Sequence, residues 1–313
     1  MDYNGPLIEF RRLHRFFGKT RAVNDVSFEV AAGHVFGYIG PNGAGKTTSM
    51  RILASLDLPT AGDALVDGFS VVNDPDHVRR RLGFIPDYFG TYPDMNCSEY
   101  LDFFARAYGL MGAERSRAIR HVMGFTGLTS LADKPINELS KGMKQRLCLG
   151  RAMVHDPKVM VLDEPASGLD PRARVELRTM IRELATTGKA ILISSHILTE
   201  LAEICDSVGI IEHGSLLAVG TVEEIQGQRE TSTVHVRVLQ RAHEYLAWLN
   251  ERDDVSELQI DGELLSFTSK GGKENQAGLL RATIEAGFRV VEFGSRTRSL
   301  EDVFMNITQG RLQ

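Results

Sequence analysis

The segment Gly-Pro-Asn-Gly-Ala-Gly-Lys-Thr at positions 40–47 constrains the fold of this chain more than any other feature. It has the pattern G-x-x-x-x-G-K-[ST], follows the apolar run Val35–Ile39 and precedes a stretch of helical character. Glycines let backbone N–H groups converge on phosphate oxygens, and the N-terminus of a following helix adds a positive dipole end. The segment therefore predicts a phosphate-binding loop between a strand and a helix of an α/β domain.

Individual residues of this loop have separate expected roles. Lys46 is expected to reach the β- and γ-phosphates of a bound nucleotide, and the hydroxyl of Thr47 to ligate Mg²⁺. The remaining positions are expected to surround the phosphates. The predicted nucleotide-binding loop comprises Gly40, Pro41, Asn42, Gly43, Ala44, Gly45, Lys46, Thr47 and Thr48.

A second apolar run, Val159–Leu162, leads into two acidic residues, Asp163 and Glu164. We interpret the run as a buried strand that ends in both acids, so that their side chains point to opposite sides and do different work. We expect Asp163 to face Mg²⁺ and Glu164 to polarise the water that attacks the γ-phosphate. An Asp-Glu pair at a strand end is common, and only the phosphate-binding loop makes this interpretation strong.

Short β-branched runs alternate with helical patterns from about residue 7 to residue 227. This alternation predicts a largely parallel sheet that binds its ligand at the carboxyl ends of the strands. The segments Leu7–Phe17 and Ser27–Val30 instead alternate apolar and polar residues, which is typical of a half-exposed antiparallel sheet.

A polar stretch at 226–233 is interpreted as a linker, and we expect two domains, residues 1–228 and 229–313. In the second, the pattern is strand, helix, strand, strand, helix, strand, the order of a small α+β, ferredoxin-like domain. A last helix follows, whose apolar face is formed by Leu300, Val303, Phe304 and Ile307. We interpret that face as packing on a core; a partner-binding groove is the alternative.

Composition excludes several other classes of protein. Of the 313 residues, 42% are apolar and 25% charged, as in ordinary globular domains, and the net charge of −5 provides no general attraction for nucleic acid. The cysteines Cys97, Cys148 and Cys205 have no metal-binding spacing and are expected to be reduced and buried. No signal peptide and no transmembrane helix are expected, so any membrane part belongs to another chain.

Further segments give the chain a family resemblance. The segment Leu-Ser-Lys-Gly-Met-Lys-Gln-Arg at 139–146 resembles the signature of ATP-binding-cassette (ABC) ATPases, and it stands shortly before the acidic strand, as in that family. Residues 167–170 resemble the family's D-loop, His196 its switch histidine and Phe17 its adenine-stacking aromatic residue. The resemblance implies a P-loop ABC-type ATPase domain with a mixed sheet, an antiparallel amino-terminal β-subdomain and a helical subdomain. The carboxy-terminal region more loosely resembles the accessory domain of one exporter branch.

The resemblance also implies roles for single residues. Ser140 and Gly142 would contact the γ-phosphate that is bound by an opposing subunit, and Asp170 would couple the two sites. His196 would touch the γ-phosphate, and Phe17 would stack on adenine. Because each chain has one phosphate-binding loop and one signature, two complete sites require a dimer.

The chain departs from the family pattern in two places. The usual signature reads Leu-Ser-Gly-Gly-Gln, and here Lys141 and Met143 replace its first glycine and its glutamine. Lys141 either contacts a phosphate or is simply solvated. Asp87 stands where the family usually has a glutamine that senses Mg²⁺, water and the permease. We keep it as a coupling-loop candidate that could approach the metal only through water or a shift of the loop.

These observations predict the ATP-binding and ATP-hydrolysing subunit of an ABC transporter, an exporter whose permease is a separate chain. It is expected at the cytoplasmic face of the cell membrane, held there by the permease, as a homodimer or paired with a related ATPase. A soluble ABC ATPase that acts on ribosomes or DNA, and a regulatory module controlled by ATP binding, are the alternatives. The sequence does not indicate the substrate.

Overall fold

The computed structural model describes residues 5–88, 90, 92, 94–226, 231–296 and 300–309 of the chain. The chain forms two compact units, Met1–Val219 and Gly220–Gln313. The domain boundary expected between residues 228 and 229 lies outside the described residues and stays a prediction. In the sequence the two units meet within strand β10 (Ser215–Thr221).

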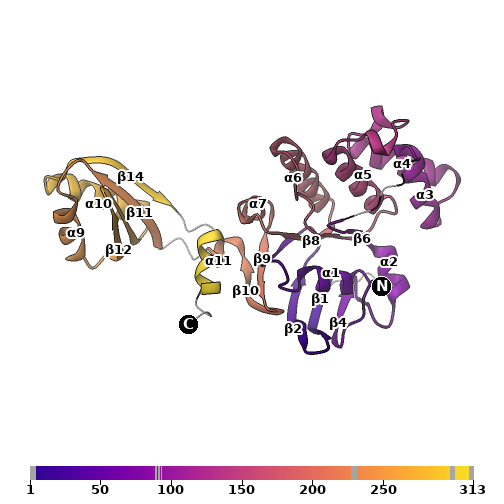
Figure 1. Ribbon diagram of the computed structural model, residues 1–313, viewed down its shortest axis with the longest axis horizontal. Coiled ribbons are helices and arrows are strands. Elements are labelled where there is room, and N and C mark those ends of the chain that lie inside the picture. Colours follow the sequence, from indigo (N-terminus) through magenta and orange to yellow (C-terminus); the bar gives the residue numbers. More distant parts are fainter. Residues whose placement is uncertain are drawn as a thin grey trace. The chain divides into compact units, whose positions relative to one another are not determined.

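A six-stranded sheet with the order β10-β9-β3-β8-β7-β6 is the centre of the first unit (Figure 1). The five strands from β9 to β6 pair in parallel. Their bounds are β3 Val35–Ile39, β6 Leu82–Ile85, β7 Val159–Leu162, β8 Ala190–Ser195 and β9 Ser207–Glu212. All residues of β3, β7 and β8 are buried, as expected for strands that are covered on both faces.

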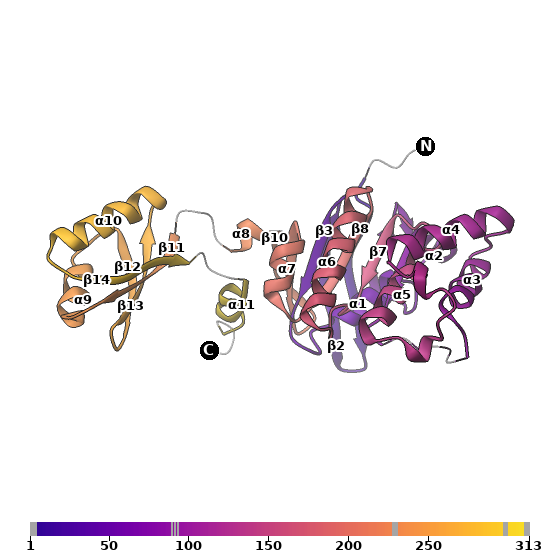
Figure 2. The same cartoon turned by 90° about the horizontal axis from the view of Figure 1, so that it is seen from above.

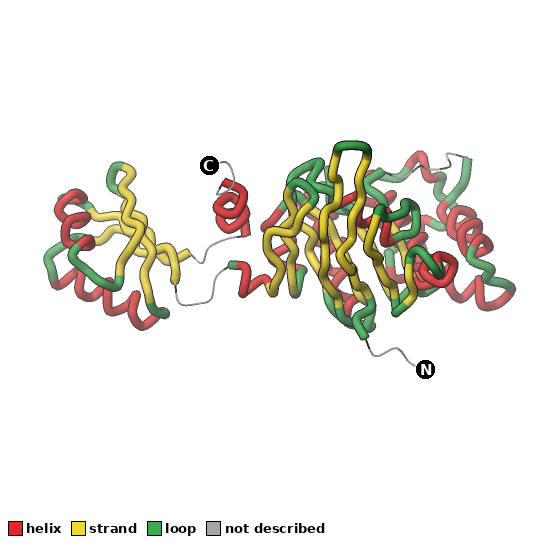
Figure 3. Tube along the Cα trace, turned by 90° about the horizontal axis from the view of Figure 1, so that it is seen from below, coloured by secondary structure: helices red, strands yellow, loops and turns green. Residues whose placement is uncertain are grey.

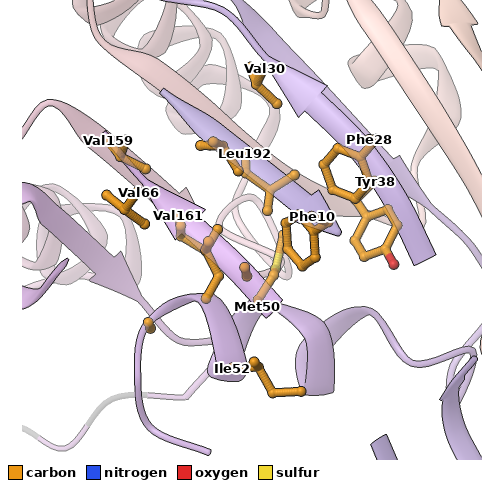
Figure 4. Close-up of a cluster of buried hydrophobic side chains, with 14 of the residues drawn as sticks. Phe10, Phe28, Val30, Tyr38, Met50, Ile52, Val66, Val159, Val161 and Leu192 are labelled. Carbon is orange, nitrogen blue, oxygen red and sulfur yellow. The ribbon is translucent and has the colours of Figure 1, made fainter. Parts of the chain in front are cut away.

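A second, antiparallel sheet has the order β2-β1-β4-β5. Its strands are β1 Ile8–Phe17, β2 Thr20–Val30, β4 Ala61–Val66 and β5 Phe69–Ser70. The expected combination of a parallel sheet and an amino-terminal antiparallel sheet is therefore confirmed. The alternating apolar residues of the antiparallel sheet form one core with the buried faces of the parallel strands and of helix α1 (Lys46–Leu53) (Figure 4).

Aromatic side chains order this shared core. The ring of Phe28 stacks between those of Phe10 and Phe36, with both centroid distances at 4.4 Å. Met50 of helix α1 (Lys46–Leu53) is fully buried in the same cluster, which Figure 4 shows beside Phe10. Burial of this face holds the helix that follows the phosphate-binding loop against both sheets.

Apart from α2 (Pro75–Arg81), which packs against strands β4, β5 and β6, the other helices of the first unit form two groups. Helices α3, α4 and α5 pack on one another beside the β6 edge of the sheet, and α6 and α7 pack against each other along the sheet (Figure 2). Their bounds are α2 Pro75–Arg81, α3 Cys97–Ala107, α4 Gly112–Phe125, α5 Lys141–Met153, α6 Pro171–Thr186 and α7 Leu198–Ile204, with short 3₁₀ turns at Thr129–Leu131 and Ile136–Glu138. Pro171 is the first residue of α6, where the fixed φ of proline suits the start of a helix.

The second unit contains an antiparallel sheet with helices α9 (Ala242–Asn250) and α10 (Lys273–Glu285) against one of its faces, while α8 (Val222–Ile225) and α11 (Leu300–Gln309) contact each other (Figure 3). Its strands, in the order β12-β13-β11-β14, are β11 Thr231–Val238, β12 Val255–Asp261, β13 Leu264–Lys270 and β14 Val290–Arg296. Tyr245 of α9 and Leu279 of α10 pack with Val236 and Phe267 of the sheet in a separate core.

In the described residues, no helix combines the length and the apolar character that crossing a membrane requires. The three cysteines are free and buried.

Candidate nucleotide-binding site

The loop between β3 and α1 has a backbone that only glycine tolerates at some positions. Gly45 caps the amino-terminal end of α1 at φ +106°, and a Cβ there would overlap the carbonyl oxygen of Ala22. A Cβ at Gly40 would overlap the carbonyl oxygen of Ile211, whereas at Gly43, with φ +81°, it would meet nothing within 4 Å. The tip residues 41–43 are exposed and residues 44–46 are buried. The loop is thus fixed at both ends and open at its tip.

Lys46 directs its ammonium group back into this loop. The side chain is only 6% exposed, and Nζ donates to the carbonyl oxygens of Gly40 at 2.6 Å and Pro41 at 3.3 Å. Nζ also lies 3.7 Å from Oε1 of Glu164. The positive charge therefore lies between the loop and the acidic end of β7, where a phosphate would meet both.

Asp163 lies at the floor of the site with one oxygen satisfied. Oδ1 accepts a hydrogen bond from the hydroxyl of Ser194 at 2.7 Å, and Oδ2 is buried without a hydrogen-bond partner among the described residues. Burial raises the pKa of Asp163, and the hydroxyls of Ser194 and Thr47 oppose this shift by favouring the charged form. A buried carboxylate with an unused oxygen, beside a threonine hydroxyl, fits a divalent cation that prefers oxygen ligands.

Glu164 corrects one part of the sequence interpretation. Strand β7 ends at Leu162, so the two acids do not alternate along a strand. Glu164 instead has a left-handed backbone with φ +49°, and its N–H donates to Oγ of Ser194 at 2.9 Å. The turn, rather than the pleat of a strand, sends the two carboxylates in different directions.

His196 lies directly beyond β8 and contacts Glu164. Its Nδ1 donates to Oε2 of Glu164 at 2.7 Å, and its backbone N–H lies 3.3 Å from the same oxygen. The ring is 56% exposed, so it reaches Glu164 from the solvent side. The structure therefore brings together Lys46, Asp163, Glu164 and His196 from three different segments of the chain.

Asp87 and Phe17 lie at the margins of this group. Asp87 is exposed, two residues beyond β6, and its charge adds to the effect of burial on the pKa of Asp163. Phe17 is the last residue of β1 and is 49% exposed.

The signature and D-loop residues form a second group at the starts of α5 and α6. Ser140 caps α5, accepting a hydrogen bond from the N–H of Met143 at 3.3 Å, and Asp170 caps α6 through the N–H of Ala173 at 2.9 Å. A Cβ at Gly142 would lie 3.1 Å from the Cβ of Ala173. Ser140 and Asp170 therefore also have a local role as helix caps.

Lys141 lies across the D-loop of its own chain. A Cβ at Gly168, which has φ +63°, would overlap the ammonium group of Lys141. The lysine that departs from the usual signature thus occupies space that the D-loop glycine leaves open.

The sequence interpretation missed Ser194. This residue is fully buried in β8, donates to Asp163 and accepts from the N–H of Glu164. The signal that was available is a serine within the apolar run Ala190–Ser195, since a buried hydroxyl needs partners. Only the pairing of β7 with β8 shows which partners it has.

Comparisons with known proteins agree with this geometry. The family model described as ABC transporter matches residues 23–167, and the model of the carboxy-terminal domain of DrrA1-3-like ATP-binding proteins matches residues 220–308. A solved structure of an ATP-binding subunit of an ABC transporter is 32% identical, with a TM-score of 0.64, covering 70% of this chain and 92% of that one. Fold and site thus define a P-loop ATPase of the ABC class.

Relatives extend the match over the whole chain. The Nod factor export ATP-binding protein I of Burkholderia lata is 36% identical over 310 residues, which covers 98% of either chain. The probable multidrug ABC transporter ATP-binding protein YbhF of Escherichia coli is 36% identical over 222 residues, 71% of this chain and 38% of that protein. The chain belongs to the family of ATP-binding subunits of ABC transporters. The predictions of an ATP-binding transport ATPase and of a resemblance to an exporter branch are confirmed.

Proposed function

We propose that this chain drives export by a separate permease subunit, and that it works at the cytoplasmic face of the membrane as one half of an ATPase dimer. The observation that carries the proposal is the meeting of Lys46, Asp163, Glu164 and His196 around the loop that precedes α1. Export is supported by the printed names of two relatives, a Nod factor export protein and a probable multidrug transporter protein. The permease, rather than this chain, is proposed to select the substrate that is exported.

In the proposed reaction, this site positions and neutralises charge rather than forming a covalent bond to the substrate. The ammonium of Lys46 binds the β- and γ-phosphates and leaves the loop carbonyls it contacts now. Glu164 orients a water for attack on the γ-phosphorus and takes up its proton as the bond to the bridging oxygen breaks. His196 donates to the Glu164 carboxylate through Nδ1. In the imidazolium form its Nε2 also carries a proton, which it can donate to the γ-phosphate.

Mg²⁺ is proposed as the cofactor that neutralises the phosphate charge. Thr47 and Asp163 would hold it, with Asp87 able to contribute through water from the margin of the site. In the described residues no cluster of three or more His, Cys, Asp and Glu side chains forms a metal site. A single protein carboxylate suits Mg²⁺, because this ion is commonly bound by one or two carboxylates together with substrate phosphates.

The second group of residues is proposed to complete the site of an opposing subunit. Ser140 and Gly142 lie at the amino-terminal end of α5, a 13-residue helix whose free N–H groups favour an anion. Asp170 begins the neighbouring helix α6 and is proposed to link the two sites. The partner in the dimer is either a second copy or a related ATPase.

We propose that the permease docks where α3 and α5 meet β6, and that helices α3–α5 form the family's helical subdomain. A cavity of 280 Å³ lies there, lined by Leu56, Phe84, Phe104, Tyr108, Arg151 and others. Near it, Tyr88 and Tyr92 are 87% and 49% exposed, which is unusual for large aromatic residues. Phe89, which follows Tyr88 in the chain, lies outside the described residues.

The carboxy-terminal domain is proposed to have a ferredoxin-like fold and to begin at residue 229. The β-α-β-β-α-β order and the strand order β12-β13-β11-β14 support this proposal. Either bracing of the dimer or its regulation would suit such an accessory domain.

Glu164→Gln tests the proposed function. The variant should bind ATP and lose turnover about 100-fold or more, since a general base is removed, and a stable ATP-bound dimer should accumulate. ATP hydrolysis and size-exclusion chromatography measure both effects, with Glu183→Gln on the exposed side of α6 as a matched control.

Purifying the Glu164→Gln protein from native membranes with Mg²⁺ and ATP then tests the partner. A membrane protein at comparable stoichiometry supports the transporter proposal. A ribosomal or DNA-repair partner would leave the ATPase assignment intact and favour the soluble alternative. Undiminished ATP hydrolysis by the Glu164→Gln variant in the first experiment would show that Glu164 is not catalytic.

A further inference from the structure

The ring of Phe17 is covered on one face by the side chain of Arg15. The guanidinium carbon lies 4.4 Å from the ring centroid, within the range of a cation–π contact. Phe17 is nevertheless 49% exposed, whereas the side chain of Arg15 is only 24% exposed. The arginine therefore lies behind the ring, and the accessible area of Phe17 belongs to its other face and edge.

Arg15 is itself held in place by an acidic residue from another segment. Its Nη2 lies 2.8 Å from Oδ1 of Asp57, and the Asp57 side chain is only 23% exposed. The same carboxylate oxygen accepts the N–H of Leu58 at 2.9 Å, which fixes its orientation. The guanidinium of Arg15 is half-buried, and its planar group pairs with a carboxylate that is itself fixed, so it has little rotational freedom.

The segment that carries Asp57 directly follows α1, the helix that begins at Lys46. Close by, Thr60 fixes the end of β1: its Oγ1 accepts the N–H of Phe16 at 3.0 Å, and its own N–H donates to the carbonyl of His14 at 2.7 Å. The ring of Phe17 is thus connected through short contacts to the same helix that starts at the phosphate-binding loop.

We propose that Arg15, fixed by Asp57, is a positioning residue for the nucleotide base: it holds the ring of Phe17 at a set place relative to the phosphate site, with one face presented to adenine. The inference rests on the proposed stacking role of Phe17. Arg15 acts through the ring and does not touch the reacting atoms, so its removal weakens binding of the base and leaves phosphoryl transfer as it is. A lysine, which lacks the planar group, does not replace it.

Two ligands separate the base from the phosphates: Mg²⁺–ATP and Mg²⁺–tripolyphosphate, which has no base. Dissociation constants are measured for Phe17→Ala, Arg15→Ala, Arg15→Lys and Asp57→Asn, with Arg11→Ala as the matched control. Arg11 lies on the same strand, is 57% exposed and pairs with Glu9, away from the ring.

Phe17→Ala should weaken ATP binding about 10-fold, the usual effect of losing one stacked base. Arg15→Ala and Arg15→Lys should weaken it about 2- to 5-fold, the range of an exposed to partly buried cation–π contact, and Asp57→Asn should act in the same direction. None should change tripolyphosphate binding. In steady-state assays KM for ATP should rise while kcat stays constant. Arg15→Ala should add nothing in the Phe17→Ala background, because the ring through which it acts is gone.

Three results would overturn the inference. If Phe17→Ala weakens ATP binding and Arg15→Ala does not, the ring stacks without needing the arginine, and the proposed function stands. If Arg15→Ala weakens tripolyphosphate binding equally, the arginine supports the loop or the fold rather than the base. If Phe17→Ala itself has no effect, the stacking role on which the inference rests is wrong, while the ATPase site is untouched.

Discussion

Glycines of the phosphate-binding loop are required for different physical reasons. Gly45 combines a left-handed backbone with a backbone oxygen where a Cβ would lie, whereas Gly43 has only the left-handed backbone. An alanine at either position would have to adopt a left-handed backbone conformation, which costs an L-residue about 1–2 kcal/mol. Only Gly45 must in addition displace strand β2, which holds Ala22.

We therefore expect Gly45→Ala to lower the free energy of unfolding by more than 3 kcal/mol, about that of a strained site with a backbone clash. Gly43→Ala should lower it by about 1 kcal/mol. Urea unfolding of both variants measures the difference. Equal losses would show that backbone conformation alone, without the clash, makes glycine necessary.

Ser194 is the residue through which the two acids of the site are held together. Ser194→Ala leaves Oδ1 of Asp163 and the N–H of Glu164 without their partner. Asp163 is proposed to ligate Mg²⁺, and replacing a residue that orients a metal ligand typically lowers metal affinity or activity about 10- to 100-fold. We expect ATP turnover to fall by that factor and to require more Mg²⁺.

Ser195→Ala is the matched control for Ser194→Ala. Ser195 is the next residue of β8, is 3% exposed, and bonds the N–H of Ile197 instead of the acids. ATP hydrolysis measured against Mg²⁺ concentration compares the two. A larger effect of Ser195→Ala would mean that the position of α7, rather than of the acids, limits the reaction.

Among the secondary-structure elements, the end of α5 and strand β6 are joined through His155. Its Nε2 donates to the carbonyl of Leu82 at 3.2 Å, and its ring stacks on Tyr108 with a centroid distance of 3.6 Å. Burial lowers the pKa of His155 to about 4, from the ordinary value of 6.5. The neutral imidazole is therefore part of the folded packing between these elements.

This shift has a definite consequence for stability. Below pH 6.5 the unfolded chain takes up a proton at His155 that the folded chain does not bind until about pH 4. The free energy of unfolding must then fall as the pH drops through this window, by about 2 kcal/mol after allowing for solvent screening. His155→Gln should remove that part of the pH dependence, whereas His121→Gln, on the exposed side of α4, should not. If thermal unfolding of the His155→Gln variant depended on pH as steeply as that of the unchanged protein between pH 6.5 and pH 4, the role of His155 would be contradicted.

On the scale of the whole molecule, each unit has its own hydrophobic core. Phe267 is 1% exposed in the core of the second unit, and Phe10 is 2% exposed in that of the first. Replacing a buried phenylalanine by alanine costs about 3–5 kcal/mol, because apolar contacts are lost and a cavity remains. The cost should fall on the unit that contains the residue.

We expect Phe267→Ala to lower the melting temperature of the carboxy-terminal unit and to leave the dissociation constant of ATP unchanged at 25 °C. Phe10→Ala should lower the melting temperature of the nucleotide-binding unit instead. Differential scanning calorimetry with and without Mg²⁺–ATP measures both. If Phe267→Ala weakened ATP binding as much as Phe10→Ala, the two cores would not be energetically separate.

Local sequence patterns were sufficient for much of the fold and part of the site. Strands β3 and β7 span the apolar runs Val35–Ile39 and Val159–Leu162, because burial of a strand on both faces requires a continuous run of apolar neighbours. The same holds for Lys46 and the glycines before it, whose spacing along one loop is enough for phosphate binding. The sequence by itself therefore determined the class of protein, the loop and the order of elements.

The tertiary structure decided which side chains meet. The pairing of Glu164 with His196 and the place of Ser194 between two acids depend on the parallel pairing of β7 with β8, about 30 residues apart in the chain. The left-handed turn at Glu164 and the contact of Arg15 with Asp57 likewise have no local signal. Contacts between distant segments depend on sheet register and packing, which no short stretch of sequence specifies.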